Sequence, residues 1–338
     1  MSENHSILLT GGAGFIGSSM VAACVAAGHH VVVLDKLTYA GSRANLEWIR
    51  GNWQLVVGDI GDQSLVLRLL SEHRVRWVVN MAAESHVDNS ISGPRDFMDT
   101  NILGTFSLLE ACRAYQPQAP EGFRVLQVST DEVYGSLGAT GAFSETSPMR
   151  PNSPYSASKA AADHLARAWF ETYGLPCLIT HCTNNYGPRQ HPEKLIPRMI
   201  DSALAGKPLP VYGDGLNVRD WIHVSDHCRG LLLALKQGKT GEVYDFGGRA
   251  EAQNITMVKQ LCVLLDKLCP RADKVSYAQQ ITFVADRPGH DRRYAIDDSK
   301  AQRELGYLPQ MTLESGLEAT VRWYLDNRAW VDAIRRAA

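Results

Sequence analysis

Asp131 and Glu132 stand side by side after the apolar run FRVLQV and the residues Ser129 and Thr130. Two carboxylates in this position can serve as an acid and a base for neighbouring atoms of a substrate. They can hold different protonation states at one pH if they are buried to different depths. The pair is a candidate for catalysis, and the alternative is an ordinary polar exit from a strand.

Tyr155 and Lys159 form a second candidate pair in SPYSASKAAADHLARAW. Side chains four residues apart share a helix face, so the ammonium would lie beside the phenol and favour the phenolate. Such a phenol can take a proton from a substrate alcohol while NAD accepts the hydride. The same lysine can bond the nicotinamide ribose. The alternative for both residues is a solvated helix face.

A glycine-rich string supplies the expected cofactor site. ILLTGGAGFIGS places Gly11, Gly14 and Gly17 between a predicted strand and a predicted helix, where a tight turn and free backbone N–H groups can receive a pyrophosphate. Asp35 closes the second strand and can accept hydrogen bonds from the adenosine ribose. It would repel a 2′-phosphate, which favours NAD over NADP, although the adjacent Lys36 argues slightly against this choice.

The stretch GDIGD after the third strand predicts an adenine contact at Asp59 and Ile60, with a polar turn as the alternative. The complete set of residues predicted to bind the cofactor is Gly11, Gly14, Phe15, Ile16, Gly17, Asp35, Lys36, Asp59, Ile60, Ala82, Ala83, Tyr155 and Lys159.

The elements that must position these residues alternate along the first half of the chain. Short β-rich runs alternate with segments whose apolar residues recur at helical spacing, which indicates a parallel sheet covered on both faces. We therefore expect an α/β fold, a doubly wound parallel sheet of Rossmann type, with a smaller α+β substrate-binding lobe. The predicted strands are 6–10, 30–35, 53–57, 77–82 and 124–129, and the predicted helices are 14–28, 64–73 and 97–115.

The second half is looser and richer in Gly, Pro and charge. We predict a dinucleotide-binding domain over 1–184, to which segments around 220–250 return, and a lobe over 185–338 that mainly binds the nucleotide-sugar. The run 177–182 reads as another strand of the first domain.

Composition narrows the class of protein. The chain has 338 residues, 45% hydrophobic and 21% charged, with a formal net charge of −2. This balance is typical of a globular protein and argues against nucleic acid as a partner. Seven cysteines without a CxxC pair indicate free thiols in a reducing compartment. MSENHSILLT lacks the features of a signal peptide, and no apolar run is long enough for a membrane span, so we expect a cytoplasmic protein.

Taken together, TGGAGFIG, the acid that ends the second strand and YxxxK resemble the extended short-chain dehydrogenase/reductase family, whose members act on nucleotide-sugars. AAESHVDNSI, STDEVYG, NNYGPRQHPEKLIP, GLNVRDWIHVSDH and DRPGHDRRYAID are similar to the hexose 4,6-dehydratases of that family nearly end to end. Epimerase relatives usually carry small polar residues in place of Asp131 and Glu132.

The resemblance implies a hydro-lyase that uses tightly bound NAD to convert dTDP-glucose to dTDP-4-keto-6-deoxyglucose. The resemblance implies that Tyr155 and Thr130 act on the C4 oxygen, that Glu132 removes the C5 proton and that Asp131 protonates the C6 oxygen, while Lys159 supports Tyr155. The alternative is a dehydratase or 4-epimerase of another nucleotide-sugar, such as a UDP-hexose. A remote alternative is a non-catalytic dinucleotide sensor.

The same resemblance indicates which residues hold the substrate. They are Ser85 and His86 for the sugar, Tyr212 for the base, and Asn184, Lys194, Leu195, Arg219, Asn254, Arg287 and His290 for the diphosphate and further polar contacts. The guanidinium group of an arginine can donate two parallel N–H hydrogen bonds to the oxygens of a phosphate. For a lone loop Arg or Lys, a solvated surface charge is the alternative reading.

Three further expectations complete the sequence reading. The chain departs from the family at Arg189 and His191, where aromatic residues are more usual, so the preference for one sugar or base stays open. The histidines show no metal-ligand grouping, and we expect no metal. The broad apolar faces of 97–115 and 155–173 predict a homodimer through a four-helix bundle, unless both faces are covered by their own sheet.

Overall fold

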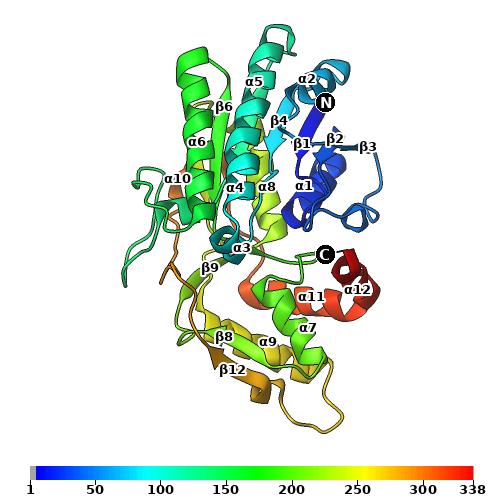
Figure 1. The fold of residues 1–338 in the computed structure, drawn as a ribbon, viewed down its shortest axis with the longest axis vertical. Coiled ribbons are helices and arrows are strands. Elements are labelled where there is room, and N and C mark those ends of the chain that lie inside the picture. The colour runs from blue at the N-terminus through cyan, green and yellow to red at the C-terminus, as the bar shows by residue number, and fades with distance from the viewer. Residues whose placement is uncertain (1–4, 338) are drawn as a thin grey trace.

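A seven-stranded parallel sheet forms the centre of the larger lobe (Figure 1). The structure is a computed structural model that describes residues 5–337. Of the N-terminal stretch that we expect to lack a signal peptide, the first four residues lie outside this described range. The strand order is β10-β6-β5-β4-β1-β2-β3. These strands are β1 Ser6–Thr10, β2 His30–Asp35, β3 Trp53–Val57, β4 Trp77–Asn80, β5 Arg124–Val128, β6 Cys177–Cys182 and β10 Val243–Phe246.

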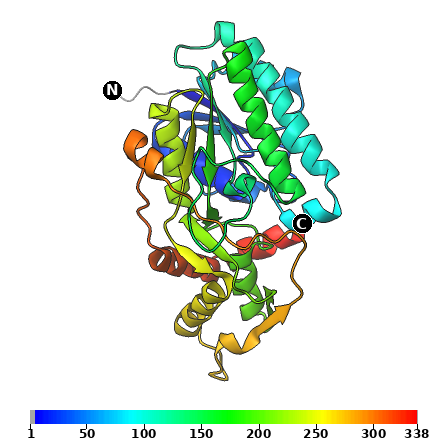
Figure 2. The same ribbon diagram turned by 90° about the vertical axis from the view of Figure 1, so that its left-hand side faces the viewer.

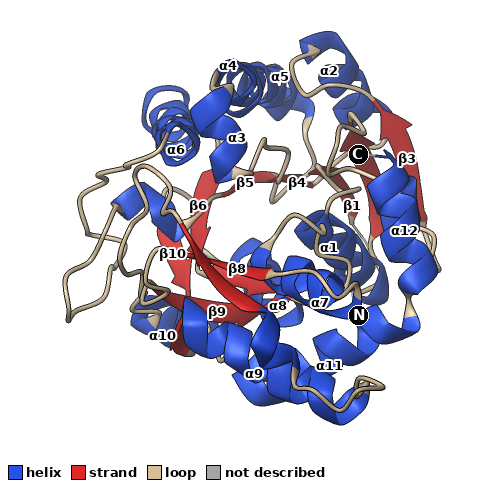
Figure 3. Cartoon of the chain, turned by 60° about the horizontal axis from the view of Figure 1, so that its bottom comes forward, coloured by secondary structure: helices blue, strands red, loops and turns tan. Residues whose placement is uncertain are grey.

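Helices cover both faces of this sheet, which confirms the predicted α/β fold of Rossmann type (Figure 3). One face packs against α1 Phe15–Ala26, α8 Val224–Gln237 and α10 Ser299–Leu305. The other packs against α2 Gln63–Glu72, α5 Thr105–Tyr115 and α6 Pro154–Tyr173. Strand residues such as Leu8 and Val32 are fully buried, as expected for a sheet that meets water on neither face.

The second lobe lies beyond the carboxyl ends of the central strands (Figures 1 and 2). Its strands are β7 Asn184–Tyr186, β8 Leu209–Tyr212, β9 Val218–His223, β11 Glu251–Gln253 and β12 Ile281–Val284, which form a three-stranded and a two-stranded sheet. Its helices are α7 Leu195–Leu204, α9 Asn254–Leu268, α11 Leu313–Asp326 and α12 Arg328–Ala337. They enclose a separate apolar core that includes Met257, Leu261 and Ile200.

The chain crosses between the lobes more than once. After β9 in the second lobe, α8 and β10 return to the large sheet, within the segment for which we predict a return. Helix α10 also returns and packs against α8 and β10, and its Ala301 and Leu305 are buried in the core of the large lobe.

The predicted helix over 97–115 is interrupted. Short helices α3 Val87–Ser92 and α4 Arg95–Phe97 lead into η2 Met98–Gly104, a π-helical segment, before α5 begins. Wide helical turns of this kind are frequent at functional sites. Asn101 in this segment donates to the Glu84 carbonyl at 3.0 Å and to the Ser158 hydroxyl at 2.8 Å, so the segment ties the loop after β4 to α6.

Short 3₁₀ helices complete the chain. They are η1 Arg43–Asn45, η3 Gln116–Gln118, η4 Asp131–Tyr134 and η5 Tyr277–Gln280. Among the described residues, no helix combines the length and the apolar character that a membrane crossing needs.

Candidate active site

One cavity of about 450 Å³ lies between the two lobes, at the carboxyl ends of the central strands. This is where open α/β sheets bind ligands. Every residue predicted for catalysis, cofactor or substrate lines this cavity. The sheet lobe contributes the glycine loop, Asp35 and Asp59, and the second lobe contributes Lys194, Tyr212 and Arg219. The carboxylates of Asp131 and Glu132, the acid pair, line the cavity between the two sets.

The glycine loop forms a cradle in which side chains would not fit. Gly11 has a φ of +68°, which favours glycine. A Cβ at Gly17 would lie 2.1 Å from the Gly11 carbonyl oxygen, so α1 begins in direct contact with the loop. A Cβ at Gly14 would meet only that oxygen, at 3.3 Å, and would otherwise fill the space before the helix N-terminus. Free N–H groups at that end suit a pyrophosphate.

We expect Gly17→Ala to lower the free energy of unfolding by about 1–3 kcal/mol, the usual cost of overpacking. The reason is the backbone clash at 2.1 Å, which no rotamer change can relieve. Thermal unfolding and the amount of dinucleotide that copurifies would measure the effect. The matched control is Gly138→Ala, because a Cβ there meets no atom within 4 Å. Equal behaviour of the two variants would contradict the close approach.

The carboxylate of Asp35 is fixed below this cradle. It accepts hydrogen bonds from the backbone N–H groups of Ala13 and Leu37, each at 2.8 Å. Lys36, the neighbour that argued against NAD, forms an ion pair with Asp59 at 2.7 Å. Because Asp59 already neutralises this ammonium, Lys36 is poorly placed to bind a 2′-phosphate, and the two carboxylates oppose one.

The acid pair begins helix η4 at the end of β5. The Thr130 hydroxyl accepts from the Glu132 N–H at 3.3 Å and so caps this turn. Asp131 is 2% exposed, and one of its carboxylate oxygens receives no hydrogen bond from the described residues. Burial, with a smaller contribution from the Glu132 charge, raises the pKa of Asp131 well above its ordinary value.

The environment of Glu132 differs from that of its neighbour. Burial raises the pKa of Glu132 as well, but the cations Arg287, Arg219 and Lys194 all act to lower it. The pKa of both carboxyl groups is raised, that of Asp131 well above its ordinary value, and three positive side chains oppose the rise at Glu132. This difference between adjacent carboxyl groups is the kind that an acid and a base require.

Helix α6 presents Tyr155 and Lys159 to the cavity. Ser153 caps it in a reciprocal capping box with Ser156, and Pro154 occupies the first turn, so the helix begins directly before Tyr155. The Lys159 ammonium donates to the Val128 carbonyl at 2.7 Å.

The pKa of Tyr155 is raised well above its ordinary value, first by burial and then by the Glu132 charge, while a hydrogen bond with Thr130 lowers it. The lowering expected from Lys159 is therefore not the dominant influence on the phenol. Burial also lowers the pKa of Lys159, and Asp163 acts against that change.

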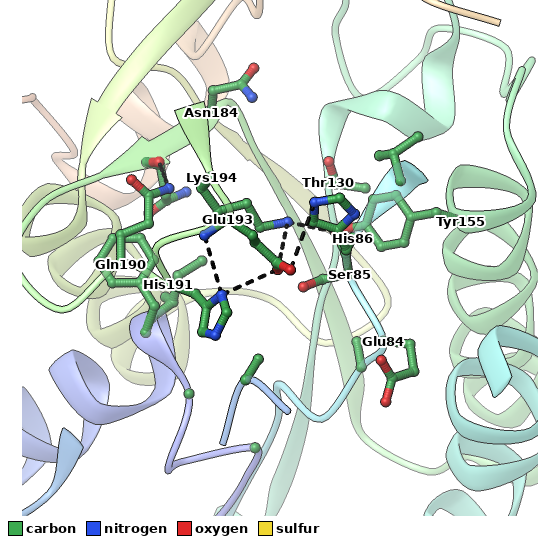
Figure 4. A pocket seen from close by; sticks show the side chains of 18 of the residues that line it. Glu84, Ser85, His86, Thr130, Tyr155, Asn184, Gln190, His191, Glu193 and Lys194 are labelled. Atoms are coloured by element: carbon green, nitrogen blue, oxygen red, sulfur yellow. Dashed lines mark hydrogen bonds and ion pairs between the residues drawn. The ribbon is translucent and has the colours of Figure 1, made fainter. Parts of the chain in front are cut away.

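The second lobe supplies a basic wall. Lys194 donates to the Ser85 carbonyl at 2.9 Å, and both residues lie at the cavity (Figure 4). Lys194 precedes α7, whose first residue Leu195 offers a backbone N–H at the helix end. Arg219 is 5% exposed and lies 4.3 Å from the centre of the Tyr294 ring. The Asn184 side-chain oxygen is buried and receives no hydrogen bond from the described residues.

Asp88 joins two predicted substrate residues. It accepts from the Tyr212 hydroxyl at 3.3 Å and pairs with Arg287 at 3.2 Å. The last predicted residues also line the cavity: His290 pairs with Asp286 at 2.6 Å, and Asn254 begins α9.

Ser85, His86 and His191 surround Glu193 (Figure 4). The Glu193 carboxylate lies 3.7 Å from a ring nitrogen of His86 and 3.7 Å from one of His191. Burial lowers the pKa of each histidine to about 4, which favours the neutral rings. The sequence reading missed Glu193, Glu84 and Asp88 as lining residues, although all three stand inside the quoted motifs.

Arg189, the second departure from the family, fastens the loop instead of entering the cavity. Its guanidinium lies 3.9 Å from the ring centre of Trp48 in the sheet lobe and 5.1 Å from that of Trp323 in α11. Cation–π contacts of this kind suit a planar cation. The side chain thus joins the two lobes beside the cavity.

Comparison with known proteins agrees with this geometry. The family model described as GDP-mannose 4,6 dehydratase matches residues 8–320. A dTDP-glucose 4,6-dehydratase of Xanthomonas campestris pv. campestris (strain B100) is 57% identical over 333 residues, covering 97% of this chain and 95% of the relative.

Two solved structures extend the comparison. DesIV, a dTDP-glucose 4,6-dehydratase from Streptomyces venezuelae, superimposes with a TM-score of 0.89 at 48% identity, covering 97% of this chain and 99% of that one. A Thermotoga maritima UDP-glucose 4-epimerase reaches 0.85 at 30% identity, with 96% and 99% covered, so the fold is shared by two reactions. The match of the family model to residues 8–320 and the match to a dehydratase over 95% of its length show that this chain belongs to the GDP-mannose 4,6-dehydratase family and, within it, to the dTDP-glucose 4,6-dehydratases.

Proposed function

We propose that this enzyme, a hydro-lyase, converts dTDP-glucose to dTDP-4-keto-6-deoxyglucose with NAD as cofactor. The observation that carries the proposal is the position of Asp131 and Glu132 in the same cavity as Tyr155 and Lys159. A 4-epimerase needs only an acid–base group for the C4 oxygen. An adjacent acid and base are needed when water must also leave across C5–C6.

The residues divide the reaction into four proton movements. Tyr155, assisted by Thr130, takes the proton of the C4 hydroxyl, and the resulting ketone makes the C5 proton acidic. Glu132 removes that proton, and Asp131 protonates the C6 oxygen as it leaves as water. Glu132 then returns a proton to C5. NAD, when bound, accepts the hydride from C4 and supplies it again at C6.

The protonation states support this division of roles. Elimination needs a neutral acid beside an ionised base at one pH. Burial and the Glu132 charge raise the pKa of Asp131, opposed among the cations by Arg219, whereas Arg287, Arg219 and Lys194 all act to lower the pKa of Glu132. Burial and cation placement therefore favour Asp131 as the acid and Glu132 as the base.

The cavity also supports the predicted binding roles. The Gly14 cradle fits the pyrophosphate of NAD and Asp35 fits its adenosine ribose, with Lys159 on the nicotinamide side. Glycine-loop residues Phe15 and Ile16, together with Asp59, Ile60, Ala82 and Ala83, line the same end. We assign the sheet lobe to the cofactor and the second lobe, with Lys194, Arg219 and Arg287, to the substrate diphosphate.

Product analysis tests the proposal. Purified protein is incubated with dTDP-, UDP- and GDP-hexoses without added NAD, and the products are identified by mass. The expected result is a dTDP-sugar lighter than its substrate by one water, since the cofactor is restored in each turnover and would stay bound. A product of unchanged mass but altered stereochemistry would instead establish a 4-epimerase, the second reaction of this fold.

We further propose a homodimer and a cytoplasmic location. Helices α5 and α6 pack side by side, and Phe106 in α5 and Leu103 in the preceding η2 are 43% and 55% exposed. A second copy bringing the same two helices would cover these side chains in a four-helix bundle. All seven cysteines are free thiols, six of them buried, as suits a reducing compartment. Light scattering of the purified protein decides the oligomeric state.

A further inference from the structure

A chain of buried polar side chains runs beneath the acid pair and reaches α6. The Ser129 hydroxyl donates to the Asp163 carboxylate at 2.7 Å. One ring nitrogen of His181 bonds the same carboxylate at 3.2 Å, and the other bonds Asp245 at 2.9 Å. The Tyr134 hydroxyl, in the same turn as the acid pair, donates to Asp245 at 3.1 Å. All five residues are 5% exposed or less.

His181 is the positive centre of this chain. Each ring nitrogen bonds a carboxylate, and the nitrogen that bonds Asp245 also lies 2.7 Å from the Tyr134 hydroxyl. Donation to both carboxylates requires two N–H groups, which only the imidazolium has. Burial acts to lower the pKa of His181, but the hydrogen bonds to Asp163 and Asp245 outweigh it and raise the pKa to about 10. Glu145, which accepts from the Asp245 N–H at 3.1 Å, is the remaining acid near this group.

Asp163 connects this chain to the catalytic helix. It stands one helical turn after Lys159, on the same buried face of α6. Only one of its oxygens is used by Ser129 and His181; the other receives no hydrogen bond from the described residues. The fixed negative charge of Asp163 thus remains available to an ammonium on the same face.

Lys159 needs such a counter-ion. Its side chain is 5% exposed, and its ammonium bonds the neutral carbonyl of Val128. The charged or titratable groups that act on its pKa are Asp163 and Cys182, while Glu132 and Asp131 act on Tyr155 of the same helix. The Cys182 thiol is neutral, because burial raises its pKa. Asp163 is therefore the group that offsets the cost of burying this cation.

We propose that Asp163, held in place by Ser129 and His181, is the counter-ion of Lys159 and acts as a positioning residue for the Tyr155–Lys159 pair. This inference rests on the proposed function. The consequence is electrostatic: without Asp163 the buried lysine loses its proton at lower pH, and a neutral lysine no longer favours the Tyr155 phenolate.

The pH profile of Asp163→Asn tests this. The amide keeps the shape of the side chain and removes its charge. Loss of an opposite charge nearby lowers the pKa of a lysine by about 1–3 units, so the alkaline limb of kcat should move to lower pH by at least about one unit. The substrate KM should change little, since Asp163 does not line the cavity. Asp163→Glu, which restores the charge, should move the limb back toward its original position.

The control is Tyr115→Phe. Tyr115 is also buried and donates to a backbone carbonyl, that of Val75, in the core on the α2 and α5 side of the sheet. A purely structural role for Asp163 would lower activity equally at every pH and leave the limb in place, as we expect for the control. That outcome would overturn the proposal.

A second measurement uses the unmodified protein, so that the proposal stays testable if Asp163→Asn does not fold. Carbon-13 lysine NMR of the unmodified protein follows the protonation of Lys159, assigned with Lys159→Arg. An ammonium that persists at pH 8 supports the counter-ion, and a neutral Lys159 at pH 7 contradicts it. Product formation by the unmodified enzyme is scored separately, so that failure of the proposed reaction is distinguished from failure of this inference.

Discussion

Replacing Tyr155 by Phe is expected to lower the turnover of dTDP-glucose by about 10²–10⁴-fold, the usual contribution of a positioned acid–base group. Tyr155 lines the cavity together with Thr130, Asp131 and Glu132, at the head of a capped helix. The variant removes the phenolic oxygen that takes the C4 proton while leaving the ring in place. Conversion is measured by mass analysis of the nucleotide-sugar.

The matched control for this substitution is Tyr277→Phe. Tyr277 is buried in the second lobe, donates to the Cys269 carbonyl and does not line the cavity. The control should convert substrate at nearly the original rate. Unchanged conversion by the Tyr155 variant would remove the proposed mechanism and would suit a dinucleotide sensor, which does not need this phenol.

Glu132→Gln should separate oxidation at C4 from loss of water. The amide cannot remove the C5 proton, so dehydration should fall by about 10²–10⁴-fold. Exchange of the C5 hydrogen with deuterated solvent should fall with it, and the 4-keto hexose should be detectable before dehydration. Asp131→Asn provides the comparison: it retains Glu132, so C5 exchange should continue while departure of the C6 oxygen is slowed.

The control for charge alone is Glu121→Gln, which alters an exposed glutamate before β5. It should match the unmodified enzyme in both exchange and dehydration. If Glu132→Gln exchanges the C5 hydrogen at the original rate, Glu132 is not the base, and the roles given to the two carboxylates must be changed.

The central sheet was predictable because its signals are local. Residues such as Leu8, Val32 and Val79 are fully buried, and their strands read as continuous apolar runs separated by helical periodicity, which fixes a parallel sheet. The glycine loop was predictable for a similar reason. A Cβ at Gly17 would meet the backbone of Gly11 and Gly12, so this requirement lies within one short segment, whereas at Gly11 the excluding atoms belong to Met81 and Ala82.

Other features depend on contacts between distant segments, which no local pattern records. The pairing of Arg189 with Trp48 and Trp323 joins three separate parts of the chain. The return of α10 to the large lobe likewise depends on a surface that exists only after α8 and β10 have packed.

By itself the sequence determined the element order, the cradle for a pyrophosphate and the residue types of the reaction, since each depends on neighbours along the chain. Tertiary structure alone decided the electrostatic setting of those residues. Asp131 and Glu132 are adjacent in sequence, yet Arg287 and Lys194 act to lower the pKa of Glu132 alone, whereas Arg219 acts on both carboxyl groups. His181 becomes a buried cation because folding brings Asp163 and Asp245 to its two sides. Burial and the charges of distant segments set protonation, and both arise only when the lobes are assembled.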